Sequence, residues 1–172
     1  MAKVVYSIGD DISTDVIYPG RYMATVLPTE TPQYAFVDDS PFNSQLKSKQ
    51  IPPGSIISAG ANFGCGSSRE QAVSTLKGHE LIIVARSVAR IFMQNAVNLG
   101  LRLIVAPEWE ASVGDEVDVL EDRVVNRTTN RSFAIERLPR ARQAIVDAGG
   151  LIAYTRKRLV EGSTVTSASR GR

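Results

Sequence analysis

The 172-residue chain lacks the residues from which disulfides and metal centres are usually built. It contains one cysteine, Cys65, and one histidine, His79. A single cysteine excludes an internal disulfide, and two such ligands do not complete a zinc or iron–sulfur site. We therefore expect no metal bound by this chain alone, and interpret Cys65 as a small residue lining a loop and His79 as a residue at a helix end or on the surface.

Long apolar runs and a strong charge imbalance are also missing. No stretch approaches the length of a membrane span, and the opening residues, MAKVVYSIGDD, do not resemble a secretory signal. The net charge is only +2, and no basic run is interleaved with aromatic residues. With 43% hydrophobic and 22% charged residues, the composition is that of a globular protein. We expect a cytoplasmic protein with neither a membrane nor a nucleic acid as partner.

Apolar runs and helical periodicities alternate in the middle of the chain. Residues 54–60, 81–85 and 103–107 are short apolar runs typical of strands buried in a parallel sheet. Between them, residues 69–76 and 87–99 have the pattern of helices. This order predicts an α/β fold with a central, mostly parallel sheet flanked by helices.

The flanking segments have a different character. Residues 3–8 alternate like a strand, and the segment beyond Trp109 contains short alternating stretches separated by turns. We predict that these later stretches form an antiparallel β appendage. A helix is expected over 139–148, with a proline at its start and two glycines closing it.

Two segments carry little periodic signal. Residues 28–55 are rich in Pro, Ser, Thr and Gln, and we expect a long irregular excursion there. Residues 161–172 are expected to be a disordered basic tail. The remainder, residues 1–160, is predicted to form a single domain.

A glycine-rich loop, GANFGCGSSREQA at residues 60–72, follows a predicted strand and precedes a predicted helix. Ser67 and Glu70 have the spacing of a capping box with Ser67 at the N-cap, which predicts that Ser67, Ser68 and Arg69 lie at the positive end of the helix, where anions bind. The lysine of a Walker loop and the third glycine of a dinucleotide loop are absent. Because an arginine fork matches a carboxylate, we favour a carboxylate ligand; a helix start of purely structural role is the alternative.

Three motifs together resemble a known family. GDDISTDVIYPGRYM, GANFGCGSSREQA and ARSVARIFMQNAVNLGL, in this order along the chain, are similar to segments of the small subunits of 3-isopropylmalate dehydratase. These subunits correspond to the swivel domain of the aconitase superfamily, and the resemblance extends over residues 3–160. It implies a swivel-type (β/β/α) fold and a hydro-lyase of leucine biosynthesis that isomerises 2-isopropylmalate to 3-isopropylmalate by dehydration and rehydration.

The resemblance also implies roles for individual residues. Ser67 is implied to be the base that removes the proton next to a substrate carboxylate, and Ser68 and Arg69 to bind substrate carboxylate. Asp15 is implied to be the active-site aspartate that assists loss of the hydroxyl and tunes a histidine of the partner. A serine hydroxyl becomes an effective base only where nearby positive charge stabilises its deprotonated form.

In the family that this sequence resembles, the hydroxyl is taken by a [4Fe–4S] cluster that three cysteines of the large subunit hold. Since this chain has a single cysteine, the resemblance implies that it binds no cofactor itself. It implies a heteromer with the large subunit, and no activity of this chain alone.

The substrate is implied to meet the loop formed by Tyr22, Met23, Ala24 and Thr25. Relatives that handle homocitrate-type tricarboxylates tend to carry a basic residue where this sequence has Ala24, so Ala24 favours the isopropyl group of a dicarboxylate, although Arg21 lies close. The alternatives are a homoaconitase, an enzyme of the citraconate, maleate or dimethylmalate type, and a non-catalytic anion-binding module.

Overall fold

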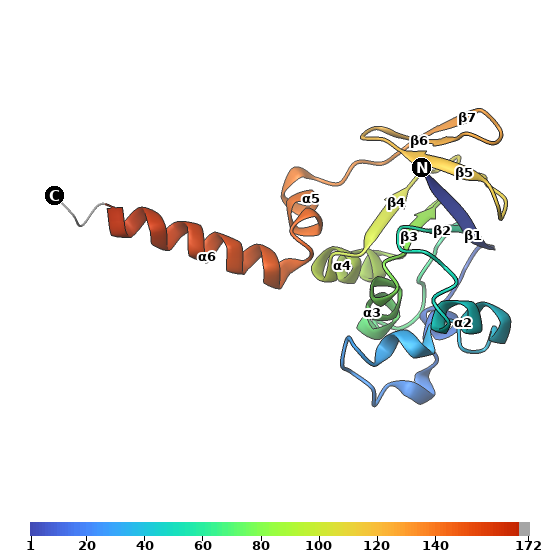
Figure 1. Ribbon diagram of the computed structural model, residues 1–172, viewed down its shortest axis with the longest axis horizontal. Coiled ribbons are helices and arrows are strands. Elements are labelled where there is room, and N and C mark those ends of the chain that lie inside the picture. Colours follow the sequence, from blue (N-terminus) through green and yellow to red (C-terminus); the bar gives the residue numbers. More distant parts are fainter. Residues whose placement is uncertain (169–172) are drawn as a thin grey trace.

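The computed structural model describes the backbone of residues 1–168 and the side chains of residues 1–161, and it is built around one seven-stranded mixed sheet (Figure 1). The strand order is β4-β3-β2-β1-β5-β6-β7. The strands are β1 (Ala2–Ile8), β2 (Ile56–Ala59), β3 (Ile82–Ala85), β4 (Arg102–Val105), β5 (Glu116–Val119), β6 (Arg123–Asn126) and β7 (Arg131–Ala134). Strands β1 to β4 pair in parallel, whereas β5, β6 and β7 pair antiparallel with their neighbours. The predicted parallel sheet with an antiparallel appendage is confirmed.

Every residue of β2 and β3 is buried, because the two faces of the sheet pack against two separate cores. Ile57 and Ile83 face the larger core, which the helices cover. Ile56 and Ile82 point to the opposite face and pack in a second core with residues of the antiparallel strands, such as Val124. Burial on both faces explains why these strands appear as continuous apolar runs in the sequence.

Helices α3 (Glu70–Gly78) and α4 (Arg90–Leu99) connect the parallel strands in the predicted β–α–β–α–β order. Helix α4 ends at Gly100, whose left-handed φ of 73° closes the last turn. Since the parallel strands run in one direction, the segments that follow β1, β2 and β3 emerge at the same edge of the sheet. That edge positions the candidate site.

The expectation of a long irregular excursion over residues 28–55 was wrong. This segment contains the 3-10 helix η2 (Thr31–Tyr34) and helix α2 (Ser40–Lys47). Asp39 caps α2 by accepting a hydrogen bond from the backbone N–H of Phe42 at 3.2 Å. The Phe42 ring is buried and stacks on Tyr6 of β1 with centroids 3.9 Å apart. This packing and the cap fix a segment whose periodicity is too weak to reveal a helix.

The short helix α1 (Thr14–Ile17) and the 3-10 helix η1 (Gly20–Tyr22) follow β1, and two helices complete the C-terminal part of the chain. The predicted helix near Pro139 is confirmed as α5 (Arg140–Asp147). Helix α6 (Leu151–Ala168) projects away from the sheet (Figure 1). It extends over residues 161–168, where a disordered tail was expected, and residues 169–172 lie outside the described part of the chain.

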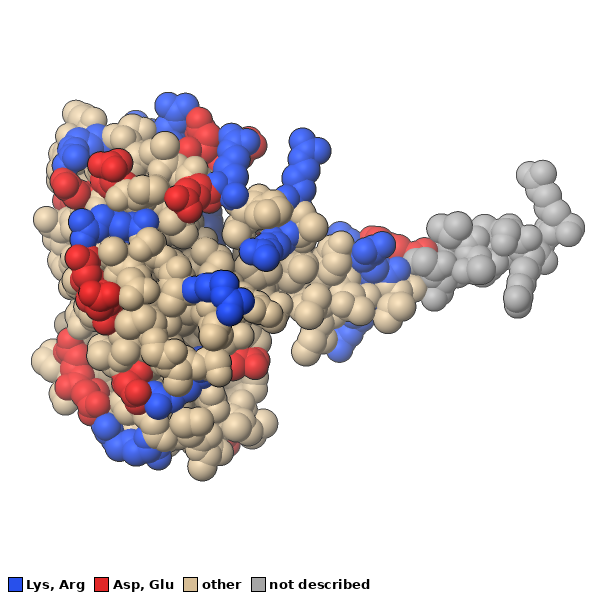
Figure 2. All heavy atoms as spheres, turned by 180° about the vertical axis from the view of Figure 1, so that it is seen from behind, with Lys and Arg blue, Asp and Glu red and all other residues tan. Residues whose placement is uncertain are grey.

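Acidic and basic side chains are interspersed on the face of the molecule shown in Figure 2. Among the described residues, no helix combines the length and the apolar character needed to cross a bilayer.

Candidate active site

Two loops that are far apart in the sequence run side by side at the carboxyl edge of the parallel strands. The loop after β1 and the glycine-rich loop after β2 continue the parallel pairing in one bridge, between Ser13 and Cys65. The N–H of Thr14 donates to the carbonyl of Cys65 at 2.8 Å, and that of Gly64 donates to the carbonyl of Ile12 at 2.8 Å. These backbone hydrogen bonds fix Ser67 relative to the residues that follow β1.

Ser67 contacts Thr14 through two polar atoms. The two hydroxyl oxygens lie 3.2 Å apart, and the Thr14 hydroxyl also donates to the Ser67 carbonyl at 3.1 Å. Thr14 is buried, whereas Ser67 is exposed. No sequence motif points to Thr14 as a functional residue, and its position directly before Asp15 is the only local signal for it.

The predicted capping box was wrong. Helix α3 begins at Glu70 with Arg69 at the N-cap, and no side chain caps it. Gly66 adopts a left-handed φ of 91°, and the turn directs the Ser67 hydroxyl to Thr14 instead of to the helix. The tertiary contact therefore replaces the local one, but Ser67 and Ser68 still precede a helix start whose first N–H groups lack a side-chain cap.

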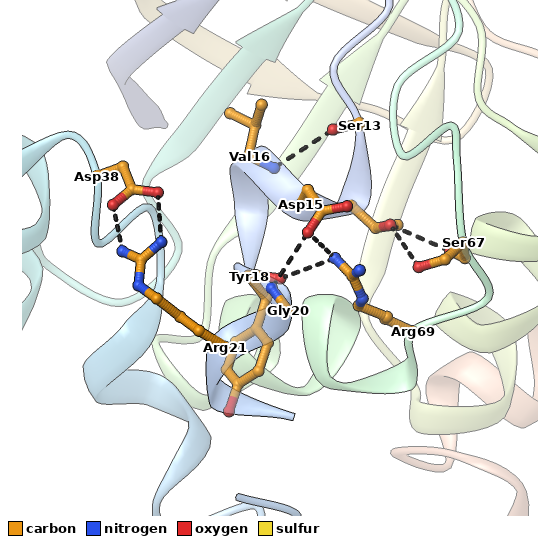
Figure 3. A network of polar contacts seen from close by, with 10 residues as sticks. Ser13, Asp15, Val16, Tyr18, Gly20, Arg21, Asp38, Ser67 and Arg69 are labelled. Atoms are coloured by element: carbon orange, nitrogen blue, oxygen red, sulfur yellow. Dashed lines mark hydrogen bonds and ion pairs between the residues drawn. The ribbon is translucent and has the colours of Figure 1, made fainter. Parts of the chain in front are cut away.

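Arg69 and Asp15 form an ion pair at the centre of this arrangement (Figure 3). The Asp15 carboxylate also accepts the N–H of Gly20 at 3.1 Å, and Nη1 of Arg69 lies 3.5 Å from the carbonyl oxygen of Tyr18. The hydrogen bond from Arg69, aided by that from Gly20, lowers the pKa of Asp15 below its usual value. A methyl group on Gly20 would lie 3.0 Å from Nη2 of Arg69, so glycine permits the close approach.

The Arg69 side chain is only 14% exposed, against 60% for Asp15. Its Nε is buried and has no hydrogen-bond partner among the described residues. Buried donors in native proteins rarely lack an acceptor. Arg69 therefore retains an unsatisfied donor next to an exposed serine and an exposed carboxylate.

The neighbouring residues of the glycine-rich loop have simpler environments. Ser68 is exposed, and its carbonyl accepts a hydrogen bond from Asn95 of α4 at 3.3 Å. Cys65 is half-buried and its thiol is free. His79 lies at the opposite end of α3, where Nε2 is 2.8 Å from the carbonyl oxygen of Pro32. No group of three or more His, Cys, Asp and Glu in the described part of the chain is arranged to hold a metal ion.

The loop expected to meet the substrate lies beside the start of α3. Gln71 of that helix donates to the carbonyl of Met23 at 3.4 Å. The Tyr18 hydroxyl lies 3.0 Å and 3.3 Å from the carbonyl oxygens of Tyr22 and Thr25, and so supports the loop from inside. Met23 and Ala24 are exposed, and Tyr22 and Thr25 are half-buried.

A second ion pair, missed by the sequence analysis, holds the beginning of the glycine-rich loop. Asp10, after β1, pairs with Arg86, after β3, and accepts the N–H of Ala61 at 2.7 Å. The backbone hydrogen bond and the guanidinium lower the pKa of Asp10. The N–H of Asn62 donates to the Ser87 hydroxyl at 2.8 Å. These contacts connect the segments that follow β1, β2 and β3, next to the glycine-rich loop that contains Ser67.

Comparison with known proteins places this arrangement in a family. Residues 11–108, which include both loops and α4, match the aconitase C-terminal domain. The chain is 42% identical over 161 residues to the 3-isopropylmalate dehydratase small subunit of Thermodesulfovibrio yellowstonii, covering 90% of this chain and 93% of that protein. It is 40% identical over 162 residues to the isopropylmalate/citramalate isomerase small subunit of Methanocaldococcus jannaschii, covering 91% and 94%.

A solved structure agrees with these relatives. The crystal structure of a 3-isopropylmalate dehydratase (leuD) from Methanocaldococcus jannaschii superposes with a TM-score of 0.83 at 37% sequence identity, covering 94% of this chain and 96% of that one. Identity at this level over nearly the whole of both chains, together with the shared fold, confirms the resemblance carried by the three motifs. The chain therefore belongs to the family of 3-isopropylmalate dehydratase small subunits, built on the aconitase C-terminal domain.

Proposed function

We propose that this chain is the small subunit of a two-subunit hydro-lyase that isomerises 2-isopropylmalate to 3-isopropylmalate by dehydration and rehydration. The observation that carries the proposal is the convergence of the exposed Ser67 hydroxyl, its Thr14 partner and the Arg69–Asp15 pair at one edge of the sheet. Relatives that carry the corresponding name are about 40% identical over nearly the whole chain, which supports the same reaction here.

Ser67 is proposed to take the proton from the carbon next to a substrate carboxylate. Its hydroxyl is exposed to a ligand on one side and contacts Thr14 on the other. The Thr14 hydroxyl donates its proton to the Ser67 carbonyl. A small rotation would direct that proton to the Ser67 oxygen as negative charge develops there, which stabilises the charged form.

Arg69 and Ser68 are proposed to bind the substrate carboxylate adjacent to that carbon. The unsatisfied Nε of Arg69 supports this role, because a carboxylate would supply the missing acceptor. Asp15 holds the guanidinium in place and, being kept ionised by it, can accept a hydrogen bond from the substrate hydroxyl.

The large subunit is proposed to supply the remaining half of the site. In the family pattern, a [4Fe–4S] cluster acts there as the Lewis acid for the departing hydroxyl. This chain has one cysteine, so three thiolate ligands have to come from elsewhere. The single cysteine also fits a reducing compartment, and we place the complex in the cytoplasm.

Exposed apolar side chains around the site support a covering partner. Val16, Met23, Val26 and Leu27 are 45%, 47%, 65% and 53% exposed, and all lie in or next to the loops described above. A group of such residues next to a site that lacks part of its chemistry is typical of a protein interface. We propose that the large subunit covers them.

A second substrate is compatible with the same loop. One relative is named an isopropylmalate/citramalate isomerase small subunit, and citramalate also lacks a third carboxylate. Ala24 presents only a methyl group, so it accommodates either alkyl substituent. The structure of the loop supports alkyl dicarboxylates as the substrate class.

The test is anaerobic reconstitution with the large subunit encoded by the same organism. We expect isomerisation of 2-isopropylmalate, or of citramalate, by the complex and no turnover by this chain alone. A complex that assembles with an intact cluster but converts neither compound would favour the non-catalytic anion-binding alternative.

A further inference from the structure

Arg21 is the only basic residue in the segment from Tyr18 to Glu30 that contains the substrate loop. Its guanidinium is directed to Asp38 and pairs with both carboxylate oxygens, with Nη1 3.1 Å from Oδ2 (Figure 3). The same guanidinium lies over the Tyr22 ring, 4.9 Å from its centroid. The Arg21 guanidinium, which directly precedes the substrate loop, therefore points away from Ser67 and Arg69 (Figure 3).

Asp38 follows η2, and residues 31–38, which include η2, make two contacts with Arg21 and the substrate loop. Besides the Arg21–Asp38 pair, the ring of Tyr34 stacks on that of Tyr22 with centroids 4.1 Å apart. The guanidinium lowers the pKa of Asp38, so the pair stays charged at neutral pH. Residues 31–38 thus hold the loop in place and neutralise the positive charge of Arg21.

The position of Arg21 makes this neutralisation relevant to substrate choice. Gly20, the residue before it, donates its N–H to Asp15 and packs against the Arg69 guanidinium. A long side chain anchored one residue from that contact could reach a ligand bound there if Asp38 did not hold it. A cation next to the ligand would attract a carboxylate and would gain nothing from an alkyl group.

We propose that Asp38 is a specificity-determining residue, which withholds the Arg21 guanidinium from the substrate and so preserves the preference for an alkyl side group over a third carboxylate. This inference rests on the proposed function. Arg21 and Asp38 are 53% and 61% exposed in their side chains, and exposed ion pairs contribute little to stability. Removing the pair should therefore change selectivity without unfolding the chain.

The experiment replaces Asp38 by asparagine (Asp38→Asn) in the reconstituted complex and measures kcat/KM for 2-isopropylmalate and for homocitrate, a tricarboxylate. We expect the ratio of the two constants to shift toward homocitrate by about tenfold, the effect of one charge-assisted hydrogen bond. The double variant Arg21→Gln with Asp38→Asn should restore the wild-type ratio, because the released cation is then absent.

Asp122→Asn is the matched control, since Asp122 forms a similar exposed pair with Arg123 in the antiparallel part of the sheet. It should leave the ratio unchanged. An unchanged ratio in Asp38→Asn, or a shift that persists in the double variant, would overturn the inference while leaving the proposed function intact. If the wild-type complex isomerises neither 2-isopropylmalate nor citramalate, the proposed function itself fails.

Discussion

The hydroxyl oxygens of Thr14 and Ser67 lie 3.2 Å apart although 53 positions separate the two residues. Backbone hydrogen bonds between the loops that follow β1 and β2 hold them together. Thr14 is buried and Ser67 is exposed, so an anchored hydroxyl supports one that faces outward. Under the proposed function, the Thr14 hydroxyl determines how strongly a negative charge on the Ser67 oxygen is stabilised.

Replacement of Ser67 by alanine should lower turnover of the reconstituted complex by about 10²–10⁴-fold, the usual contribution of a general base. The assay is kcat with 2-isopropylmalate, and the iron content of the complex is the control for an intact cluster. Turnover close to wild type would assign Ser67 to loop structure and the base to another residue.

Replacement of Thr14 by valine keeps the shape of the side chain and removes its hydroxyl. We expect kcat to fall roughly 10- to 100-fold, the effect of losing one hydrogen bond to a charged group. Thr14→Ser is the matched variant and should recover most of the activity, because it retains the hydroxyl. Equal rates for the valine and serine variants would contradict the role of this hydroxyl.

Replacement of Arg69 by lysine should raise KM and lower kcat together. Lysine keeps the charge but loses the planar fork and the Nε donor that lacks a partner here. The matched change is Arg86→Lys in the second ion pair, which contacts Asp10 instead of the candidate substrate position. Kinetics within error of wild type for Arg69→Lys would make Arg69 a structural residue.

The carboxyl group of Asp15 should titrate below its usual value in the isolated subunit, because Arg69 and the N–H of Gly20 stabilise its charged form. Because the pKa of Asp15 is lower in the folded than in the unfolded chain, its carboxylate stabilises the fold at pH values above the unfolded pKa of about 3.9. This contribution to stability is lost as the pH falls through the folded pKa. NMR titration of the side-chain carboxyl measures the shift. Arg69→Gln should move the midpoint upward, and an unchanged midpoint would show that the pair does not persist in solution.

Replacement of Ala24 by arginine should shift the preference of the complex from 2-isopropylmalate toward homocitrate. The shift should come mainly from a lower kcat/KM for 2-isopropylmalate. A third carboxylate beside Ala24 would lose its water without gaining a partner, whereas an arginine would supply one. Ala24→Leu separates the effect of size from that of charge and should not favour homocitrate. A constant ratio in the arginine variant would show that this loop does not contact the side group of the substrate.

Some features of the fold follow from local signals. The apolar runs of β2, β3 and β4 are visible in the sequence because both faces of these strands are buried, and Gly100 marks the end of α4. Helix α2 is hard to predict because only Phe42 and Leu46 mark its buried apolar face, and its other signals are a cap at Asp39 and a contact with Tyr6. The capping box predicted at Ser67 does not form, because the Ser67 hydroxyl contacts Thr14, which is distant in the sequence, instead of the N–H groups at the start of α3.

The sequence by itself determined the family and the α/β order of elements, because motif identity and apolar periodicity are properties of contiguous residues. It also brought Ser67, Ser68 and Arg69 into one candidate site, since they are neighbours in one loop. Only the tertiary structure paired Thr14 with Ser67, Asp15 with Arg69 and Arg21 with Asp38. These partners come from different segments that the sheet and its loops bring to one edge, and no local pattern encodes a contact whose geometry depends on the packing of the whole domain.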